Sequence, residues 1–211
     1  MTACRRYIKG CFDMNYIMPI TEVLKSDPVL SVKEEDRSLN PASVLMPLFI
    51  ENEELNVLFT RRSSHVAHHK GQISFPGGGV DDTDNSLKET ALRETEEEIG
   101  LAPEDVTVLG QLNHAVITYS CFIVYPFVGL IPYPYDFRLN PGEVDRLVPV
   151  PFEVFLPGTA LKEPLTPEFE AVSVLGPAYQ YHGEVIWGAT AKIIHNLVEM
   201  IGKKFHLPGI R

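Results

Sequence analysis

The feature that most constrains this chain is the segment GGGVDDTDNSLKETALRETEEEIGL at residues 77–101. Ser86 is followed three residues later by Glu89, a spacing that fits a capping box and predicts a helix beginning near Ser86. Gly100 is a natural end for that helix, because glycine adopts the left-handed conformation at little cost. A glycine-rich turn and an acidic loop therefore lead directly into one short, strongly acidic helix.

This helix has an apolar arc and an acidic arc when about 100° of rotation is assigned to each residue. The arc that we expect to face a core contains Ala91, Leu92, Thr95 and Ile99. The acidic arc contains Glu94, Glu97 and Glu98. Like charges at this spacing cost about 0.2–0.5 kcal/mol per pair on an isolated helix. A divalent cation would turn that cost into binding energy, and oxygen ligands suit Mg²⁺ or Mn²⁺.

Arg93 is placed to organise the acidic arc. It follows Glu89 by four residues and precedes Glu97 by four, so we expect its side chain to contact both carboxylates and to fix their orientation. The alternative is a solvated acidic helix face, which is common in glutamate-rich helices. The turn at residues 76–78 and the stop at Gly100 favour the metal-binding interpretation.

The core of the segment resembles the Nudix hydrolase box, G-x5-E-x7-R-E-U-x-E-E-x-G-U, in which U is a bulky aliphatic residue. The matching residues are Arg93, Glu94, Glu97, Glu98, Gly100 and Leu101. Two positions depart from the box. Thr95 stands where an aliphatic residue is usual, and Asn85 stands where the box has glutamate. The departure at Asn85 concerns one auxiliary carboxylate and leaves the expected metal ligands in place.

An upstream segment resembles a narrower pattern, L-L-T-x-R-S-x3-R-x3-G-x3-F-P-G-G, of the coenzyme A pyrophosphatase branch of the Nudix family. The matching residues are Thr60, Arg62, Ser63, Gly71, Phe75, Pro76, Gly77 and Gly78. Ala67 replaces the second arginine of the pattern, so a neighbouring basic residue would have to supply the missing charge. Further resemblance at residues 141–144 and 186–191 extends the similarity over most of residues 42–200.

The chain also separates its charges along this region, with a basic loop at residues 61–70 and an acidic segment at residues 81–105. A phosphate-rich substrate would be anchored by the basic loop and would contact the acidic segment through bridging metal ions. The candidate substrate-binding residues are Arg61, Arg62, His65, His69 and Lys70. The loop histidines, which include His68, could instead bind a transition metal or lie at the surface without a ligand.

The resemblance implies an α/β fold, the Nudix-type α/β/α sandwich with a mixed β-sheet. It implies metal-dependent hydrolysis of the pyrophosphate bond of coenzyme A or its thioesters, which gives 3′,5′-ADP and (acyl-)4′-phosphopantetheine. The ligands that it implies for Mg²⁺ or Mn²⁺ are Glu94, Glu97, Glu98 and a backbone carbonyl of Gly78 or Gly79. The catalytic residues that it implies are Arg93, Glu94, Glu97 and Glu143, and the general base stays open among the three glutamates.

Two other functions are compatible with the same motifs. A pyrophosphatase for ADP-ribose, NADH or oxidised nucleotides would keep the acidic helix and dispense with an anchor for the 3′-phosphate, and Ala67 is the observation that favours it. A non-catalytic nucleotide sensor would retain the fold, but such a protein should have lost ligands from the box. Here Arg93 and all three glutamates of the box are present.

Composition limits the partners and the compartment. The net charge of −10 argues against nonspecific binding to nucleic acid. The longest apolar stretch, residues 121–135, contains three prolines and is too short to cross a bilayer, so we expect no membrane partner. Three scattered cysteines without a C-x-x-C motif are typical of reduced thiols in the cytoplasm. The expected partner is a small-molecule nucleotide of the coenzyme A class, and a homodimer is compatible with the sequence.

The order of segments predicts an N-terminal extension at residues 1–38, partly helical around residues 17–25, and a Nudix hydrolase domain at residues 39–211. Strands are predicted from their apolar and β-branched content at residues 42–50, 55–60, 106–114, 121–131, 169–175 and 179–187. A final helix is predicted at residues 189–201. Proline-rich residues 132–141 and 149–167 are predicted to be long connectors.

Overall fold

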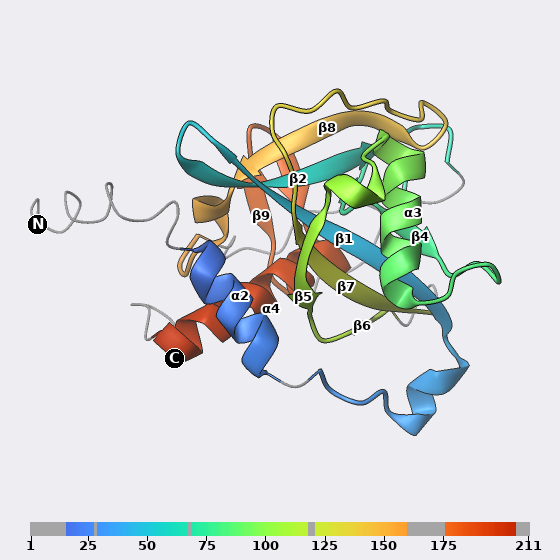
Figure 1. Cartoon of the computed structure of the whole chain (residues 1–211), viewed down its shortest axis with the longest axis horizontal. Helices are drawn as coiled ribbons and strands as arrows, with labels where there is room; N and C mark the ends of the chain where they lie inside the picture. The colour runs from blue at the N-terminus through green and yellow to red at the C-terminus, as the bar shows by residue number, and fades with distance from the viewer. Residues whose placement is uncertain (1–15, 28, 67–68, 118–120, 160–175, 206–211) are drawn as a thin grey trace, which may run out of the picture.

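A computed structural model of the chain describes residues 16–27, 29–66, 69–117, 121–159 and 176–205 (Figure 1). The strands are β1 (Asn40–Glu51), β2 (Glu54–Arg62), β3 (Ile73–Ser74), β4 (Gly77–Gly79), β5 (Thr107–Gln111), β6 (Ala115–Ile117), β7 (Phe122–Leu130), β8 (Val144–Pro151), β9 (Tyr179–Tyr181) and β10 (Glu184–Ile186). The α-helices are α2 (Ile17–Ser26), α3 (Leu87–Ile99) and α4 (Gly188–Phe205). The 3-10 helices are η1 (Glu34–Ser38), η2 (Pro103–Asp105) and η4 (Phe152–Phe155).

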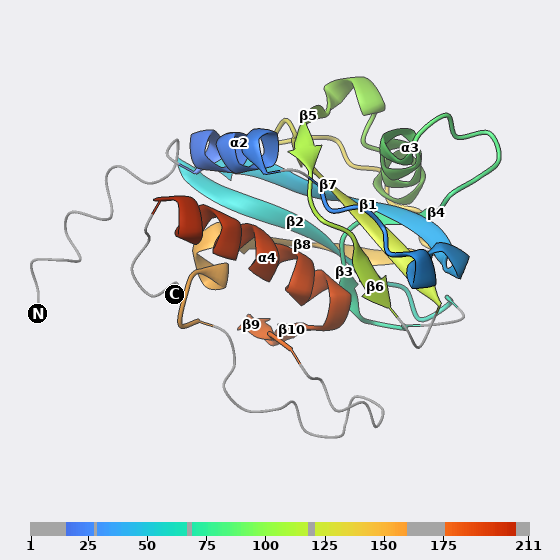
Figure 2. The same cartoon turned by 90° about the horizontal axis from the view of Figure 1, so that it is seen from below.

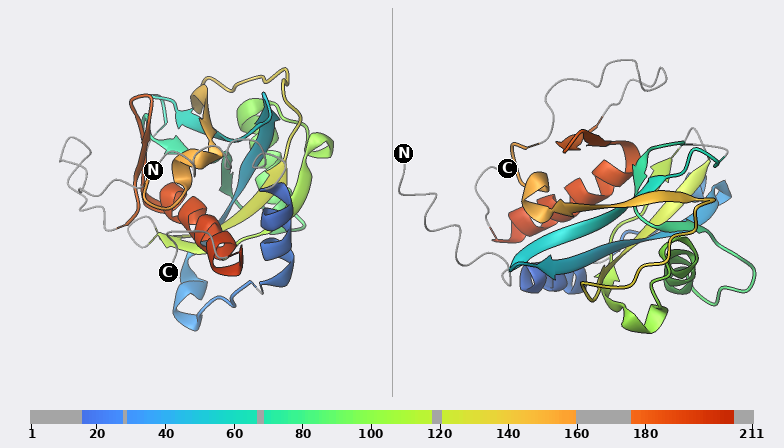
Figure 3. Two further views of the ribbon diagram at one scale, coloured as in Figure 1. Left: turned by 90° about the vertical axis from the view of Figure 1, so that its left-hand side faces the viewer. Right: turned by 90° about the horizontal axis from the view of Figure 1, so that it is seen from above.

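The main sheet is mixed and is built around β1. Its strand order is β3-β2-β1-β7-β5, with β4 paired to β1, β6 paired to β7 and β8 paired to β2. β1 runs parallel to β7 and antiparallel to both β2 and β4. Helix α3 lies on one face of the sheet and α4 on the other (Figures 2 and 3). The fold is therefore the α/β/α sandwich with a mixed sheet that the sequence predicts.

Two hydrophobic cores lie on opposite faces of β1, because successive side chains of a strand point to opposite faces. Leu45 and Phe49 pack with Ala91 and Ile99 of α3 in the smaller core. Met46 and Leu48 belong to the larger core under α4. The central strand is buried on both faces over most of its length, which explains why its sequence is almost continuously apolar.

Most of the predicted elements are confirmed, and β8 is the main correction. The sequence assigned residues 149–151 to a connector, but they are the last residues of β8, which pairs antiparallel with β2. The predicted strand at residues 179–187 is a hairpin of β9 and β10. The final helix is longer than predicted and reaches Phe205. The strand predicted at residues 169–175 lies outside the described residues.

The described part of the predicted N-terminal extension packs onto the domain. Helix α2 matches the predicted helix around residues 17–25, and its Ile20 and Val23 are completely buried in the larger core. It contacts α4 and β5. The predicted boundary at residue 38 stays a prediction. Among the described residues, no helix is both long and apolar enough to cross a membrane.

Helix α3 begins and ends as its sequence predicts. The Ser86 side chain accepts a hydrogen bond from the Glu89 backbone N–H, and Gly100 has the left-handed backbone conformation, with φ of 70°. The Glu89 carboxylate accepts hydrogen bonds from the backbone and side chain of Asn85. These contacts fix the helix start relative to the acidic loop that precedes it.

The start of β1 is covered by a strand that consists only of glycine. Gly77 pairs with Val44 and has φ of 149°, a conformation that other residues rarely adopt. A Cβ atom at Gly77 would lie 2.6 Å from the Cα atom of Val44 and also against the Ser43 carbonyl oxygen. Because these atoms belong to the backbone, they cannot move aside without disturbing β1. Glycine therefore permits the close approach of β4 to β1.

Gly77→Ala is expected to lower the free energy of unfolding by about 2–3 kcal/mol, because the new methyl group would collide with the backbone of β1. Gly79→Ala is the matched control, since a Cβ atom at Gly79 meets no atom within 4 Å. Urea unfolding of the two variants and the parent measures the difference. Equal stability of the two variants would contradict the packing described for β4.

Candidate functional site

The three predicted metal ligands lie along one side of α3, each in a different degree of contact with solvent. Glu98 is only 3% exposed, Glu94 is half-buried, and Glu97 is exposed. On the opposite arc Ala91, Thr95 and Ile99 are buried in the smaller core, with Leu92 packed at its border. The division of the helix into an apolar and an acidic arc is therefore confirmed.

Arg93 connects this helix to the acidic loop and to β4. Its guanidinium donates to both carboxylate oxygens of Asp84, at 2.9 and 3.0 Å. It also donates to Glu94 at 2.9 Å and to the Gly79 carbonyl oxygen at 3.2 Å. The Glu97 carboxylate is a more distant acceptor, at 3.3 Å. Arg93 therefore holds α3, the loop and β4 in one hydrogen-bonded unit.

Asp84 is the residue of this site that the sequence analysis missed. Its side chain is only 2% exposed, and hydrogen bonds from Arg93 hold the pKa of its carboxyl well below the usual range. The prediction that Arg93 contacts Glu89 is wrong, because Glu89 instead accepts hydrogen bonds from Asn85. The signal for Asp84 was its position in the acidic loop, but spacing along a helix cannot reveal a contact between a loop and a helix.

The two departures from the box are both accommodated. Thr95 is completely buried, and its hydroxyl donates to the Ala91 carbonyl oxygen at 2.6 Å, so the polar atom is satisfied within the helix. Asn85 hydrogen-bonds Glu89 through its side-chain amide and its backbone N–H, both to the same carboxylate oxygen. Asn85 therefore acts at the helix start, on the side of the loop away from Glu98.

Glu98 and Arg62 carry buried polar atoms without partners. Neither Oε2 of Glu98 nor Nε of Arg62 has a hydrogen-bond partner within the part of the chain that the structure describes. Burial raises the pKa of the Glu98 carboxyl to about 8, while the positive charge of Arg62 opposes this rise. Buried polar atoms of this kind usually have partners in the functional state. A cation at Glu98 and an anion at Arg62 would satisfy both.

The backbone of β4 lies against the Glu94 carboxylate. A Cβ atom at Gly78 would come within 2.5 Å of the Glu94 Cδ atom, so only glycine permits this approach. Burial raises the pKa of Glu94, and the charge of Glu143 reinforces the rise in both Glu94 and Glu98. Glu143 is held by a hydrogen bond from the Asn140 side-chain amide at 3.2 Å. The structure thus brings Glu143, from the start of β8, to the same site as the α3 glutamates.

The carboxylates fit a magnesium or manganese ion by chemistry, but they do not form a closed cage. Within the described residues, no three His, Cys, Asp or Glu side chains form a group that could hold a metal ion as they stand. Arg93 binds both Glu94 and Glu97 and so competes with a cation for these oxygens. The unpartnered Glu98 oxygen and the Glu94 carboxylate, which lies against the backbone of Gly78, are oxygen donors of the type that a hard cation requires.

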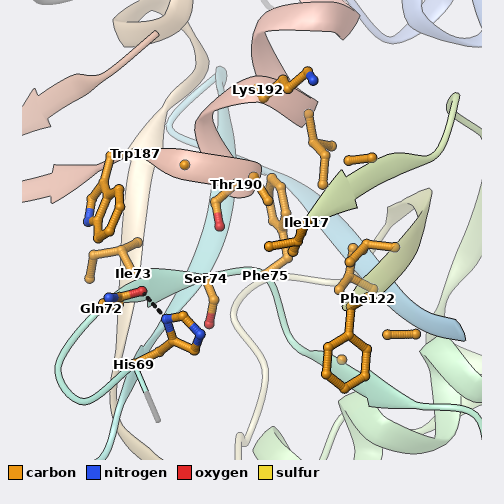
Figure 4. Close-up of a pocket in the computed structure, with 18 of the residues that line it drawn as sticks. His69, Gln72, Ile73, Ser74, Phe75, Ile117, Phe122, Trp187, Thr190 and Lys192 are labelled. Carbon is orange, nitrogen blue, oxygen red and sulfur yellow. Dashed lines mark hydrogen bonds between the residues drawn. The ribbon is translucent and has the colours of Figure 1, made fainter. Parts of the chain in front are cut away.

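A pocket of about 780 Å³ is lined by Gly77 and Gly78 of β4 and extends to the first turn of α4, and none of the α3 glutamates lines it (Figure 4). Gly77 and Gly78 line it at the carboxylate end, and Trp187 lines it near α4. His69 and Gln72 also line it and are joined by a hydrogen bond of 2.9 Å between Nδ1 and Oε1. We call this cavity the Trp187 pocket.

The predicted substrate-binding residues separate into two groups. Arg62 and His69 line the Trp187 pocket. Arg61 forms ion pairs with Glu184 and, at 3.9 Å, with Asp145. His65 and Lys70 are exposed and do not line the pocket. Ala67 and His68 lie outside the described residues. Trp187 and Lys192 were not predicted to be site residues; Trp187 lies in the segment 186–191, whose resemblance to the branch assigned it no role.

Glu98→Gln is expected to remove a pH dependence of stability in the metal-free protein. With a folded-state pKa of about 8 against an ordinary value of 4.5, the carboxyl keeps its proton in the folded state and loses it on unfolding. The free energy of unfolding therefore falls as the pH rises from about 4.5 to 8, by an amount on the order of 5 kcal/mol.

Urea unfolding with EDTA between pH 5 and 9 measures this effect. Glu96→Gln on the exposed side of α3 is the control and should retain the parent's slope. An unchanged slope in Glu98→Gln would show that the Glu98 carboxyl is ionised in the folded protein at neutral pH.

Known proteins share both the sequence pattern and the fold. Residues 39–169 match the NUDIX domain family. Over 165 residues the chain is 36% identical to the uncharacterised Nudix hydrolase NudL of Photorhabdus laumondii, which covers 76% of this chain and 84% of that protein. It is 40% identical over 162 residues to NudL of Yersinia enterocolitica, with coverage of 76% and 80%.

Among solved structures, a MutT/nudix family protein from Enterococcus faecalis matches with a TM-score of 0.53. The match covers 88% of this chain and 70% of that one at 14% identity, so it shows the fold alone. The family match, the relatives and the arrangement of α3 against β4 agree with one another. The chain therefore belongs to the Nudix family of pyrophosphohydrolases.

Proposed function

We propose that this Nudix protein hydrolyses the pyrophosphate bond of coenzyme A or its thioesters, giving 3′,5′-ADP and (acyl-)4′-phosphopantetheine. The observation that supports the proposal is that Gly77 and Gly78, whose backbone lies against Glu98 and Glu94, also line the Trp187 pocket. A substrate with its diphosphate at the carboxylates could place a further group in the pocket. Coenzyme A has such a group on each side of its diphosphate.

Divalent cations are expected to join the carboxylates to the diphosphate. Glu98, Glu94 and Glu97 would hold Mg²⁺ or Mn²⁺, with a carbonyl oxygen of Gly78 or Gly79 as a further ligand. Bound to these residues, the metal would polarise the phosphoryl oxygens and lower the pKa of a water molecule.

The chain's own side chains would orient the reacting groups. Arg62 has a buried Nε atom with no partner in the described part of the chain, and a phosphate oxygen is a suitable acceptor for it. Asp84 would keep the Arg93 guanidinium in place while Glu94 and Glu97 turn from it toward the cations. The general base would be Glu94, Glu97 or Glu143, since all three lie at the site.

Incubation with Mg²⁺ and an equimolar mixture of coenzyme A, dephospho-coenzyme A, ADP-ribose, NADH and 8-oxo-dGTP tests the proposal. We expect 3′,5′-ADP and 4′-phosphopantetheine to form fastest, as measured by mass spectrometry. Glu98→Gln should give little metal-dependent product, because the buried ligand loses its charge.

Other outcomes favour the alternative functions. Faster turnover of ADP-ribose, NADH or 8-oxo-dGTP would favour a pyrophosphatase without a 3′-phosphate anchor, as Ala67 suggests. Tight binding of a nucleotide without any metal-dependent product would favour a sensor. Equal activity of the parent and Glu98→Gln would exclude Glu98 as an essential metal ligand.

Asp84→Asn is expected to lower kcat by about 10–100-fold with a smaller effect on KM, because Arg93 would lose its strongest charged partner and the adjacent glutamates their fixed orientation. Asp82→Asn is the matched control, since Asp82 is an exposed residue of the same loop. Steady-state kinetics at saturating Mg²⁺ measures both variants. Equal kcat values would mean that Arg93 is held sufficiently by Glu94 and Glu97.

A further inference from the structure

The Trp187 pocket combines apolar walls with positive charge. The basic residues that line it are Arg62, His69 and Lys192, of which Lys192 is exposed, and no aspartate or glutamate is among the described residues that line it. This is unusual in a chain whose net charge is −10. A ligand that fills the pocket should therefore carry an apolar or aromatic surface together with negative charge.

We infer that the Trp187 pocket binds the 3′,5′-ADP half of the substrate, with the adenine ring against Trp187, and leaves the acyl-pantetheine half outside. The inference rests on the proposed function and assigns a direction to the substrate within that site. Nothing in the carboxylate site alone distinguishes the two halves, because each is joined to the diphosphate.

Charge favours the nucleotide half. The 3′-phosphate is an additional anion that the acyl-pantetheine arm does not possess beyond its share of the diphosphate. The pantetheine arm offers the basic side chains only neutral acceptors, its amide and hydroxyl oxygens, which compensate the burial of charged groups less well than a phosphate does. A phosphorylated ribose offers acceptors for such groups while its base covers the apolar walls.

The shape and the polar groups near Trp187 also suit a purine. In Figure 4 the indole of Trp187 lies beside Ile73 and Gln72 at one end of the pocket, so a planar ring that enters this end could contact an aromatic face and an aliphatic side chain. The hydrogen bond from His69 engages Oε1 of Gln72, which leaves the amide NH₂ group of Gln72 to donate to a ring nitrogen. Aromatic stacking on a base is worth about 1–3 kcal/mol.

This orientation of the substrate also predicts how turnover depends on the acyl group. If the nucleotide half fills the pocket, the acyl-pantetheine arm leaves the carboxylate site toward solvent. Turnover should then change little with the length of the acyl chain, whereas removal of the 3′-phosphate should raise KM.

Trp187 is the only tryptophan of the chain, so its fluorescence reports directly on the pocket. The full-length protein is titrated in EDTA, without divalent metal, with 3′,5′-ADP and separately with 4′-phosphopantetheine, under excitation at a wavelength selective for tryptophan. We expect saturable quenching by 3′,5′-ADP and at least tenfold weaker binding of 4′-phosphopantetheine. Preferential or equal binding of 4′-phosphopantetheine, or no response to either compound, would overturn the inference.

Two variants of Trp187 test whether this side chain contributes to the binding of 3′,5′-ADP. Calorimetric titration should show 3′,5′-ADP binding about 10–100-fold more weakly to Trp187→Leu and within about threefold of the parent to Trp187→Phe, which keeps an aromatic ring. Thermal unfolding of both variants confirms that they are folded. Unchanged affinity in a folded Trp187→Leu protein would overturn the stacking on Trp187.

The binding experiment and the hydrolysis experiment can give opposite answers, so the pocket assignment is tested separately from the proposed function. Quenching by 3′,5′-ADP in a protein that does not hydrolyse coenzyme A would support the pocket assignment and contradict the proposed substrate. Hydrolysis of coenzyme A together with selective binding of 4′-phosphopantetheine would support the proposed substrate and reverse its direction.

Discussion

The close approach of β4 to both β1 and α3 is the constraint on which this site depends. At Gly77 a side chain would collide with the backbone of β1, and at Gly78 it would collide with the Glu94 carboxylate. Backbone oxygens and helix carboxylates can therefore lie together without intervening side chains. The same strand lines the entrance to the Trp187 pocket, so one all-glycine segment defines both the carboxylate site and its connection to the cavity.

The carboxylates near β4 differ in how far positive charge offsets them. Arg93 donates hydrogen bonds to Asp84, Glu94, Glu97 and the Gly79 carbonyl oxygen, so its single positive charge offsets part of the negative charge around it. Glu98 lies deeper, and burial raises the pKa of its carboxyl although the charge of Arg62 opposes the rise. Ionisation of the buried Glu98 carboxyl is therefore unfavourable in the folded protein, and a bound cation would stabilise the ionised form.

The carboxylate face and most of the helices and strands could be predicted from local rules, whereas the sandwich fold was what the resemblance to the Nudix box implied. The capping residues, the helical periodicity of α3 and the apolar content of β1 each act over a few neighbouring residues. The contact between Asp84 and Arg93 depends on how a loop folds back, and the pairing of β8 depends on residues distant in sequence. Trp187 could not be assigned because its role depends on where α4 crosses the sheet.

The acidic and basic regions of the sequence come close together in the fold near β4. Acidic side chains lie on α3 and at Glu143, whereas Arg62 and His69 line the Trp187 pocket, and Arg62 is near enough for its charge to act on Glu98. A diphosphate held at the proposed metal site would therefore meet basic side chains for a second anionic group on the side of the Trp187 pocket. This asymmetry is a stronger guide to substrate direction than pocket size, since a neutral arm and a nucleotide could both fit the space.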